Sequence, residues 1–170
     1  MKPAPLVETS AGITVETVID SGDWPDVSDL LNKAGVMAWS VAGDGEAAEV
    51  SVALTDDDGI RQLNRDFRGK DKATDVLSFP AGDPLLPGED AVLGDIALAL
   101  SYIRAEAALE NKSFKDHLVH LFVHGLLHLI GHDHEEAAEA AEMESLEKDI
   151  LARMGIRDPY AGRELDSERQ

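Results

Sequence analysis

The chain has 170 residues, and because a chain of this length can bury about two-thirds of its unfolded surface in one core, we expect a single domain. It contains no cysteine, which excludes disulfides, thiolate metal ligands and a cysteine nucleophile, and favours a reducing compartment. The formal net charge of −19 argues against a polyanionic partner for the chain as a whole, because phosphate binding depends on lysine and arginine.

No segment has the pattern of a targeting or membrane-spanning sequence. Residues 1–16 have no apolar stretch behind their one lysine. Nowhere do about 18 apolar residues follow one another, as a membrane-spanning helix would require. We therefore expect a soluble, cytoplasmic protein with no membrane partner.

The first half of the chain is predicted to alternate strands and helices. Strands are predicted at residues 13–19 and 49–55, and helices at residues 24–41 and 58–67. Pro25 suits the first turn of the longer helix. The shorter helix would carry Ile60, Leu63 and Phe67 on one apolar face.

The second half continues this alternation. Strands are predicted at residues 75–79 and 95–100, and helices at residues 102–109, from Ser113 onward, and at residues 135–154. Ser101 and Ser113 are the expected N-caps, and Gly155 follows the last helix. Interleaved strands and helices predict an α/β or α+β layer fold with one sheet. We expect residues 1–158 to form this domain and residues 159–170 to form a flexible polar tail.

A histidine-rich motif, HGLLHLIGHDH, occupies residues 124–134. His124 and His128 are one helical turn apart, so both imidazoles can bind one metal ion without backbone strain. Gly131 can end the helix in the left-handed conformation and turn the chain back toward it, which makes His134 a plausible third ligand. Three protein ligands on zinc leave a coordination position for water, as hydrolases require.

All six histidines of the chain lie between residues 117 and 134. Hydrogen-bonded histidines on an amphipathic helix are the plainer interpretation, but the spacing of three of them favours a metal site. The other three, His117, His120 and His132, are expected to be packed or exposed imidazoles, or to orient a ligand.

The motif differs from the metalloprotease pattern His-Glu-x-x-His, because residue 125 is glycine. The motif therefore lacks the carboxylate that acts as general base on the metal-bound water in those proteases. Asp133 could replace it, or could hydrogen-bond a ligating imidazole instead.

Basic residues concentrate in one short segment, residues 61–72, which holds five of the fifteen lysines and arginines. Any anion that binds this chain is expected here, with Arg65, Lys70 and Lys72 as substrate-binding candidates. Arg68 is the candidate for stabilising charge on a scissile phosphate, because a guanidinium can hold two phosphate oxygens. A surface ion pair is the alternative for Arg68.

Together with LNRDFRGKDKATDVLSFP at residues 63–80 and LGDIAL at residues 93–98, the histidine motif resembles the YbeY family of bacterial endoribonucleases. The resemblance extends from about residue 13 to residue 155. It implies a compact fold with a small mixed four-stranded sheet, five or six helices and a zincin-like site. In that site one zinc ion is held by His124, His128 and His134, and Arg68 lines the substrate cleft.

The resemblance also implies a biological role. It indicates single-strand-specific, metal-dependent cleavage of RNA in maturation of the 3′ end of small-subunit ribosomal RNA and in ribosome quality control. The implied partners are that RNA and the small ribosomal subunit with its proteins, with a ribosome-associated GTPase as a further candidate.

Two alternatives remain open from the sequence. One is a zinc-dependent metalloprotease-like hydrolase, and the other is a ribosome assembly factor whose zinc is mainly structural. The group that takes the proton, the identity of the metal and the oligomeric state are not determined by these patterns.

Overall fold

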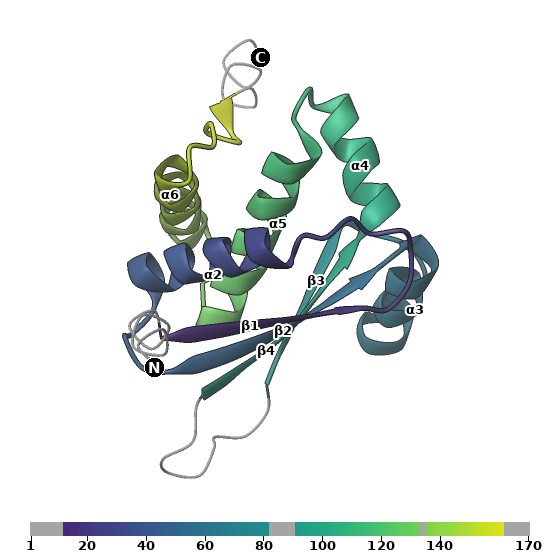
Figure 1. Ribbon diagram of the computed structural model, residues 1–170, viewed down its shortest axis with the longest axis horizontal. Helices are drawn as coiled ribbons and strands as arrows, with labels where there is room; N and C mark the ends of the chain where they lie inside the picture. The colour runs from purple at the N-terminus through teal and green to yellow at the C-terminus, as the bar shows by residue number, and fades with distance from the viewer. Residues whose placement is uncertain (1–11, 82–90, 133–134, 162–170) are drawn as a thin grey trace, which may run out of the picture.

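The computed structural model of the chain describes residues 12–81, 91–132 and 135–161. These residues form a mixed four-stranded sheet with five helices (Figure 1), which confirms the α+β class. The strands are β1 (Ile13–Ile19), β2 (Ala48–Thr55), β3 (Val76–Pro80) and β4 (Ala91–Ala99). The helices are α2 (Ser28–Ala42), α3 (Asp57–Arg68), α4 (Leu100–Leu109), α5 (Phe114–Ile130) and α6 (Ala137–Arg153). Across these ranges, no helix has the length and apolar character needed to cross a membrane.

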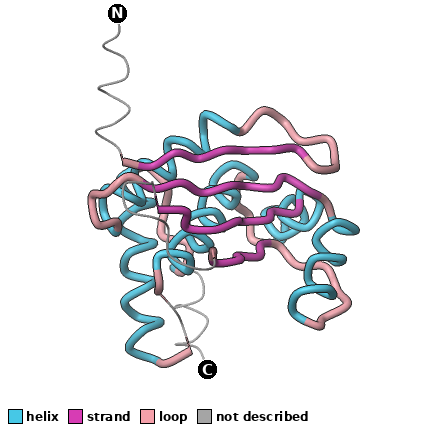
Figure 2. The backbone as a smooth tube through the Cα atoms, turned by 90° about the horizontal axis from the view of Figure 1, so that it is seen from below, coloured by secondary structure: helices cyan, strands magenta, loops and turns pink. Residues whose placement is uncertain are grey.

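The strand order in the sheet is β1-β2-β4-β3, seen from below in Figure 2. β1, β2 and β4 are parallel, whereas β3 pairs antiparallel with β4, from Val76 opposite Leu98 to Pro80 opposite Gly94. β3 is therefore an edge strand, with helix α5 packed against it.

The sheet has a large core on one face and a smaller one on the other. Because side chains alternate along a strand, Ile96 and Leu98 of β4 face the large core with Phe122 of α5. Ala97 of the same strand faces the smaller core with Ile60 of α3. α2, α5 and α6 thus cover one face, and α3 covers part of the opposite face near β3 (Figure 1).

The predicted start of the first helix is wrong, because α2 begins at Ser28 and Pro25 lies outside it. The backbone N–H and hydroxyl of Ser28 both donate to the Asp26 carboxylate, at 3.2 and 2.9 Å. Trp24 is buried instead of helical, and its indole N–H donates to the Thr55 carbonyl at 2.8 Å. This tertiary contact overrides the helix-start pattern around Pro25.

The predicted N-cap of α4 is also wrong. The helix begins at Leu100, and Ala99 occupies the cap position. Ser101 serves a different contact, in which its backbone N–H and hydroxyl donate to the Asp56 carboxylate at 3.0 and 3.2 Å. Asp56 also caps α3, so one carboxylate organises the starts of two helices.

The apolar face predicted for α3 is only partly buried. Ile60 is fully buried and Leu63 is packed beside it, but Phe67 is 70% exposed. The helix ends at Gly69, whose φ of 72° is left-handed as a C-cap requires. Phe67 keeps the predicted spacing but is not part of the small core.

The segment after α6 returns to the domain. Residues 159–161, which the sequence places in the polar tail, include Tyr160, only 8% exposed. The Lys112 amino group donates to the Pro159 carbonyl at 3.3 Å. The chain therefore stays packed through Tyr160.

Candidate metal centre

Helix α5 carries four of the histidines and has the predicted ends. The Ser113 hydroxyl accepts from the Asp116 backbone N–H at 3.1 Å, which confirms the N-cap. Gly131 has a φ of 119°, and the His132 N–H donates back to the Leu127 carbonyl at 2.9 Å. These bonds turn the chain back at the C-terminus of α5, as the spacing predicts.

His124 and His128 lie together near that end of α5. Their ring centroids are 4.7 Å apart, and the ring planes are inclined by 80°. Two imidazoles in this arrangement can contribute to one metal ion. His134, predicted as the third ligand, and Asp133 lie outside the described residues. Within the ranges that are described, no group of three metal-binding side chains occurs.

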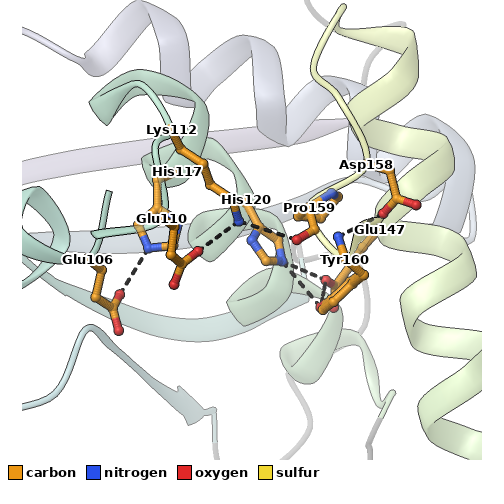
Figure 3. Close-up of polar contacts among 9 residues, drawn as sticks. All are labelled: Glu106, Glu110, Lys112, His117, His120, Glu147, Asp158, Pro159 and Tyr160. Atoms are coloured by element: carbon orange, nitrogen blue, oxygen red, sulfur yellow. Dashed lines mark hydrogen bonds and ion pairs between the residues drawn. The ribbon is translucent and has the colours of Figure 1, made fainter. Parts of the chain in front are cut away.

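Glu147 of α6 orients His124. Its side chain is fully buried, and Oε2 lies 2.8 Å from Nδ1 of His124. Oε1 lies 2.8 Å from Nε2 of His120 and accepts from the Tyr160 hydroxyl (Figure 3). One carboxylate thus joins α5, α6 and the returning C-terminal segment.

The charge state of Glu147 fixes the tautomer of its partner. Burial alone would raise the pKa of Glu147, but hydrogen bonds from His120, His124 and Tyr160 lower it to about 2. An ionised carboxylate can only accept, so Nδ1 of His124 must donate its hydrogen. Nε2 of His124 is then the nitrogen whose lone pair could bind a metal ion.

His117 and His120, which the sequence did not favour as ligands, are both bonded to carboxylates. Nε2 of His117 lies 2.9 Å from Oε1 of Glu106 (Figure 3), and burial lowers the pKa of His117. Burial, together with the charge and hydrogen bond of Asp75, raises the pKa of Glu106 to about 8. A neutral acid therefore faces a neutral imidazole at neutral pH.

His132 follows Gly131 at the end of α5. Its Nδ1 lies 3.9 Å from a carboxylate oxygen of Glu142 in α6. This contact fits the packed or exposed role predicted for His132.

Arg68 reaches the edge strand beside α5. Its Nη2 donates to the Ser78 carbonyl at 2.7 Å, and the Ser78 hydroxyl donates to the Gly125 carbonyl at 3.1 Å. Arg68 is thus connected through β3 to the residue that follows His124. The predicted alternative, a surface ion pair, is not found for Arg68 within the described ranges.

Close packing against β3 explains the glycine at position 125. A Cβ atom at Gly125 would lie 2.9 Å from the Ser78 hydroxyl oxygen and 3.4 Å from Ile96. A glutamate, as in the protease pattern, would have to displace the Ser78 hydroxyl and would break its hydrogen bond to the Gly125 carbonyl. The position that carries the general base in His-Glu-x-x-His is here a helix-to-sheet contact.

The other predicted substrate-binding residues surround the end of α3. Arg65 lies in the last turn of α3, and Lys70 and Lys72 lie in the loop after it, and all three are exposed. Arg65 lies 3.3 Å from Asp66, whereas Arg61 pairs with Asp71 at 2.7 Å. Such exposed ion pairs are weak. An anionic ligand can therefore compete with Asp66 and Asp71 for the basic side chains of residues 61–72.

The donors near His124 fit a zinc ion. They include two imidazoles one helical turn apart and a buried carboxylate that fixes one of them. A carboxylate–histidine pair is the usual support of a zinc ligand, and imidazole is a preferred ligand of zinc. The chain offers no thiolate to compete.

Glu147 and Tyr160 were missed by the sequence analysis. One signal could have identified Glu147. It lies on the buried face of α6, four residues after Met143 and three before Ile150, where a charged residue needs a partner. Tyr160 gave no such signal, because its burial depends on the path of the chain after α6.

Known proteins match this chain over most of its length. The sequence model of the family described as Endoribonuclease YbeY matches residues 22–155. An endoribonuclease YbeY of Bradyrhizobium sp. is 52% identical over 160 residues, which cover 89% of this chain and 94% of that protein. The one of Parvibaculum lavamentivorans is 42% identical over 168 residues, covering 94% and 91%. The solution structure of a Thermotoga maritima protein aligns with a TM-score of 0.58 at 29% identity, covering 81% of this chain and 87% of that one.

Proposed function

Since this chain belongs to the YbeY family of endoribonucleases, we propose that it cleaves single-stranded RNA at a zinc centre formed by His124, His128 and His134. We propose that the substrate is the 3′ end of small-subunit ribosomal RNA. The small ribosomal subunit and its proteins are then the partners, in the cytoplasm, and ribosome quality control is the wider role.

The observation that carries the zinc centre is the contact between Glu147 and His124. Burying a carboxylate costs free energy unless both of its oxygens accept hydrogen bonds. In Glu147 one oxygen contacts His120 and the other contacts His124. The arrangement leaves His124 with a fixed ring and tautomer, one helical turn from His128. Such fixed imidazoles support metal binding better than mobile ones do.

A zinc ion bound there would supply acidified water and polarise an oxygen of the phosphodiester. The protein's own residues would do the rest. Arg68, anchored to the Ser78 carbonyl by Nη2, has further N–H groups with which to bind phosphate oxygens. A cation held in this way stabilises the charge that develops as the phosphodiester bond breaks.

The metalloprotease alternative has less support. Gly125 occupies the position of the protease glutamate, and a Cβ atom there would lie 2.9 Å from the Ser78 hydroxyl oxygen, so a side chain would have to displace that hydroxyl. Cleavage of an unstructured peptide by the purified protein would nevertheless favour that alternative.

Metal analysis of the purified protein and of two variants tests the proposal. The native protein and His132→Ala should bind about one zinc ion each and cleave unstructured RNA, whereas His124→Ala should lose both properties. His132 is a matched control, because it is an imidazole near the same helix end but contacts Glu142. A native protein that takes up no metal would contradict the proposal, as would RNA cleavage by His124→Ala at the native rate.

The same variants separate catalysis from a structural zinc. If the zinc only stabilised the fold, His124→Ala would lower the melting temperature sharply, and RNA cleavage would fall only in proportion to the unfolded fraction. A folded His124→Ala without cleavage supports a catalytic zinc instead.

A further inference from the structure

Phe67 is the one exposed aromatic side chain of the protein. The chain has four phenylalanines, two tryptophans and two tyrosines, and all eight lie in the described residues. Seven of them are buried or half-buried, whereas Phe67 is 70% exposed in the last turn of α3. Single exposed apolar residues are common, so exposure alone assigns no role. Its surroundings are the additional evidence.

The Phe67 ring is held in a defined position. Its centroid lies 5.5 Å from that of Phe79 in β3, with the rings inclined by 62° in an edge-to-face contact. The Arg68 guanidinium lies 5.6 Å from the centroid of the Phe79 ring. Phe79 therefore contacts both Phe67 and Arg68, while most of the Phe67 side chain remains exposed to water.

The charge around this ring is positive in a strongly acidic protein. Residues 61–72 hold five basic and two acidic residues, in a chain with a net charge of −19. Both acidic residues are engaged, Asp66 by Arg65 and Asp71 by Arg61. Lys70 and Lys72 form no ion pair in the part of the chain that the structure describes. An anion approaching Phe67 thus meets unneutralised cations.

The edge strand links this surface to the candidate metal centre. Arg68, the neighbour of Phe67, bonds the Ser78 carbonyl, and the Ser78 hydroxyl bonds Gly125 beside His124. No further strand pairs with β3 beyond this edge within the described residues. An extended chain that passes this edge can therefore contact α3 on one side and α5 on the other.

We propose that Phe67 is a stacking platform for a base of single-stranded RNA, next to the bond that is cleaved. The proposal rests on the proposed RNA cleavage and deepens it. Single-strand binding proteins combine cationic grooves with aromatic rings, because every base has a face that can stack. A base inside a duplex is already stacked on both faces, so Phe67 selects unpaired RNA without reading its sequence.

Three variants at one position test this role. Phe67→Leu keeps an apolar side chain without an aromatic face, Phe67→Ala removes the bulk, and Phe67→Trp restores a stacking face. Leu109→Ala is the matched control, since Leu109 is an 85% exposed apolar residue of α4. Affinity is measured by fluorescence anisotropy with an unstructured 2′-O-methyl oligonucleotide, and gel electrophoresis checks that the oligonucleotide is intact after each titration. Stacking is measured by quenching of 2-aminopurine placed in it.

Phe67→Leu and Phe67→Ala should weaken binding about tenfold and abolish one site of 2-aminopurine quenching, whereas Phe67→Trp should keep both. The slope of affinity against salt should stay unchanged in Phe67→Leu, because no phosphate contact is lost. The double variant Arg65→Ala/Lys70→Ala should instead reduce that slope by about 1.4, because each phosphate contact to a single strand contributes about 0.7. Leu109→Ala should behave like the native protein.

If Phe67→Leu kept the native RNA affinity and the native quenching of 2-aminopurine, the stacking role would be overturned. The exposed ring would then be a contact for a protein partner instead. Equal weakening by Leu109→Ala would also overturn it. These outcomes are distinct from a failure of the proposed function, in which the native protein itself would neither bind nor cleave the RNA.

Discussion

The α5–α6 contact and the edge formed by α3 and β3 are built in opposite ways. In the first, the fully buried Glu147 is bonded to His120, His124 and Tyr160. In the second, Phe67 and Arg65 are exposed, and the ion pairs lie in water. The side chains of the candidate metal centre are therefore positioned by folding itself, whereas the edge remains accessible.

This difference implies that the two regions respond to different perturbations. Buried charge networks couple to stability, so a change at Glu147 should alter folding together with metal affinity. Exposed charges are screened by salt and contribute little to stability, so a change at Arg65 should alter RNA binding alone. Arg68 belongs to the second region but, in our proposal, acts on the reaction of the first.

The largest effect is expected for Arg68→Ala. Loss of a donor that stabilises transition-state charge should lower kcat for RNA cleavage by about 10²- to 10³-fold, while zinc content and melting temperature stay native. Arg61→Ala is the matched control, because Arg61 lies two turns earlier on α3 and is paired with Asp71. Native kcat in Arg68→Ala would remove this residue from the proposed mechanism and leave the edge as a binding surface only.

Glu147→Gln should have the next largest effect, on zinc affinity. The amide nitrogen of glutamine is a donor, so if it faces Nδ1 of His124, the imidazole hydrogen must move to Nε2 and block the metal. We expect zinc affinity to fall by about 10- to 100-fold. The free energy of unfolding should fall on the order of 2 kcal/mol, because the hydrogen bonds to the buried carboxylate lose their charge assistance. Competition with a chelating dye measures the first and urea unfolding the second.

The exposed Glu139→Gln in the same helix controls for the loss of one charge. A Glu147→Gln protein with native zinc affinity but reduced stability would show that the network serves the fold and not the metal. The α5–α6 contact would then have no more influence on metal binding than the α3–β3 edge has.

Local signals in the sequence predicted much of this protein, and long-range contacts account for what they missed. Strand β1 and both ends of α5 follow from alternation, the Ser113 cap and the Gly131 turn, which act within a few residues. The pair His124 and His128 follows from helical spacing. Glu147 is 23 residues from His124 in sequence, in a helix with several glutamates, so only the packing of α6 on α5 singles it out.

The misplaced helix start and the exposure of Phe67 have the same origin. Trp24 leaves the helical pattern because Thr55, 31 residues away, offers its carbonyl. Phe67 keeps the apolar spacing of α3, yet the small core ends before it reaches this position. In both cases the sequence pattern identified an apolar side chain, but only the tertiary fold decides what that side chain packs against.

The smallest effect is expected for Glu106→Gln in α4, where Glu106 contacts His117 near the start of α5, away from the proposed metal ligands. The pKa of Glu106 is raised from its ordinary 4.5 to about 8, so the folded state retains a proton that the unfolded state releases. This contribution to stability is complete below pH 4.5 and is lost as the pH rises through about 8. Glutamine imitates the protonated acid, because it can donate to Asp75 and accept from His117.

Glu106→Gln should therefore match the native stability in acid and exceed it above about pH 8, by on the order of 1 kcal/mol, since the carboxyl is partly solvated. Glu110→Gln, one turn later, should show the opposite sign. Burial alone would raise the pKa of Glu110, but the ion pair with Lys112 at 2.9 Å lowers it. Glu110→Gln should therefore lose stability at neutral pH, where the native carboxylate is ionised. Urea unfolding across this pH range measures both differences. Equal pH profiles for native protein and Glu106→Gln would mean that Glu106 is ionised in the folded protein. His117 would then donate a hydrogen bond to an ionised carboxylate.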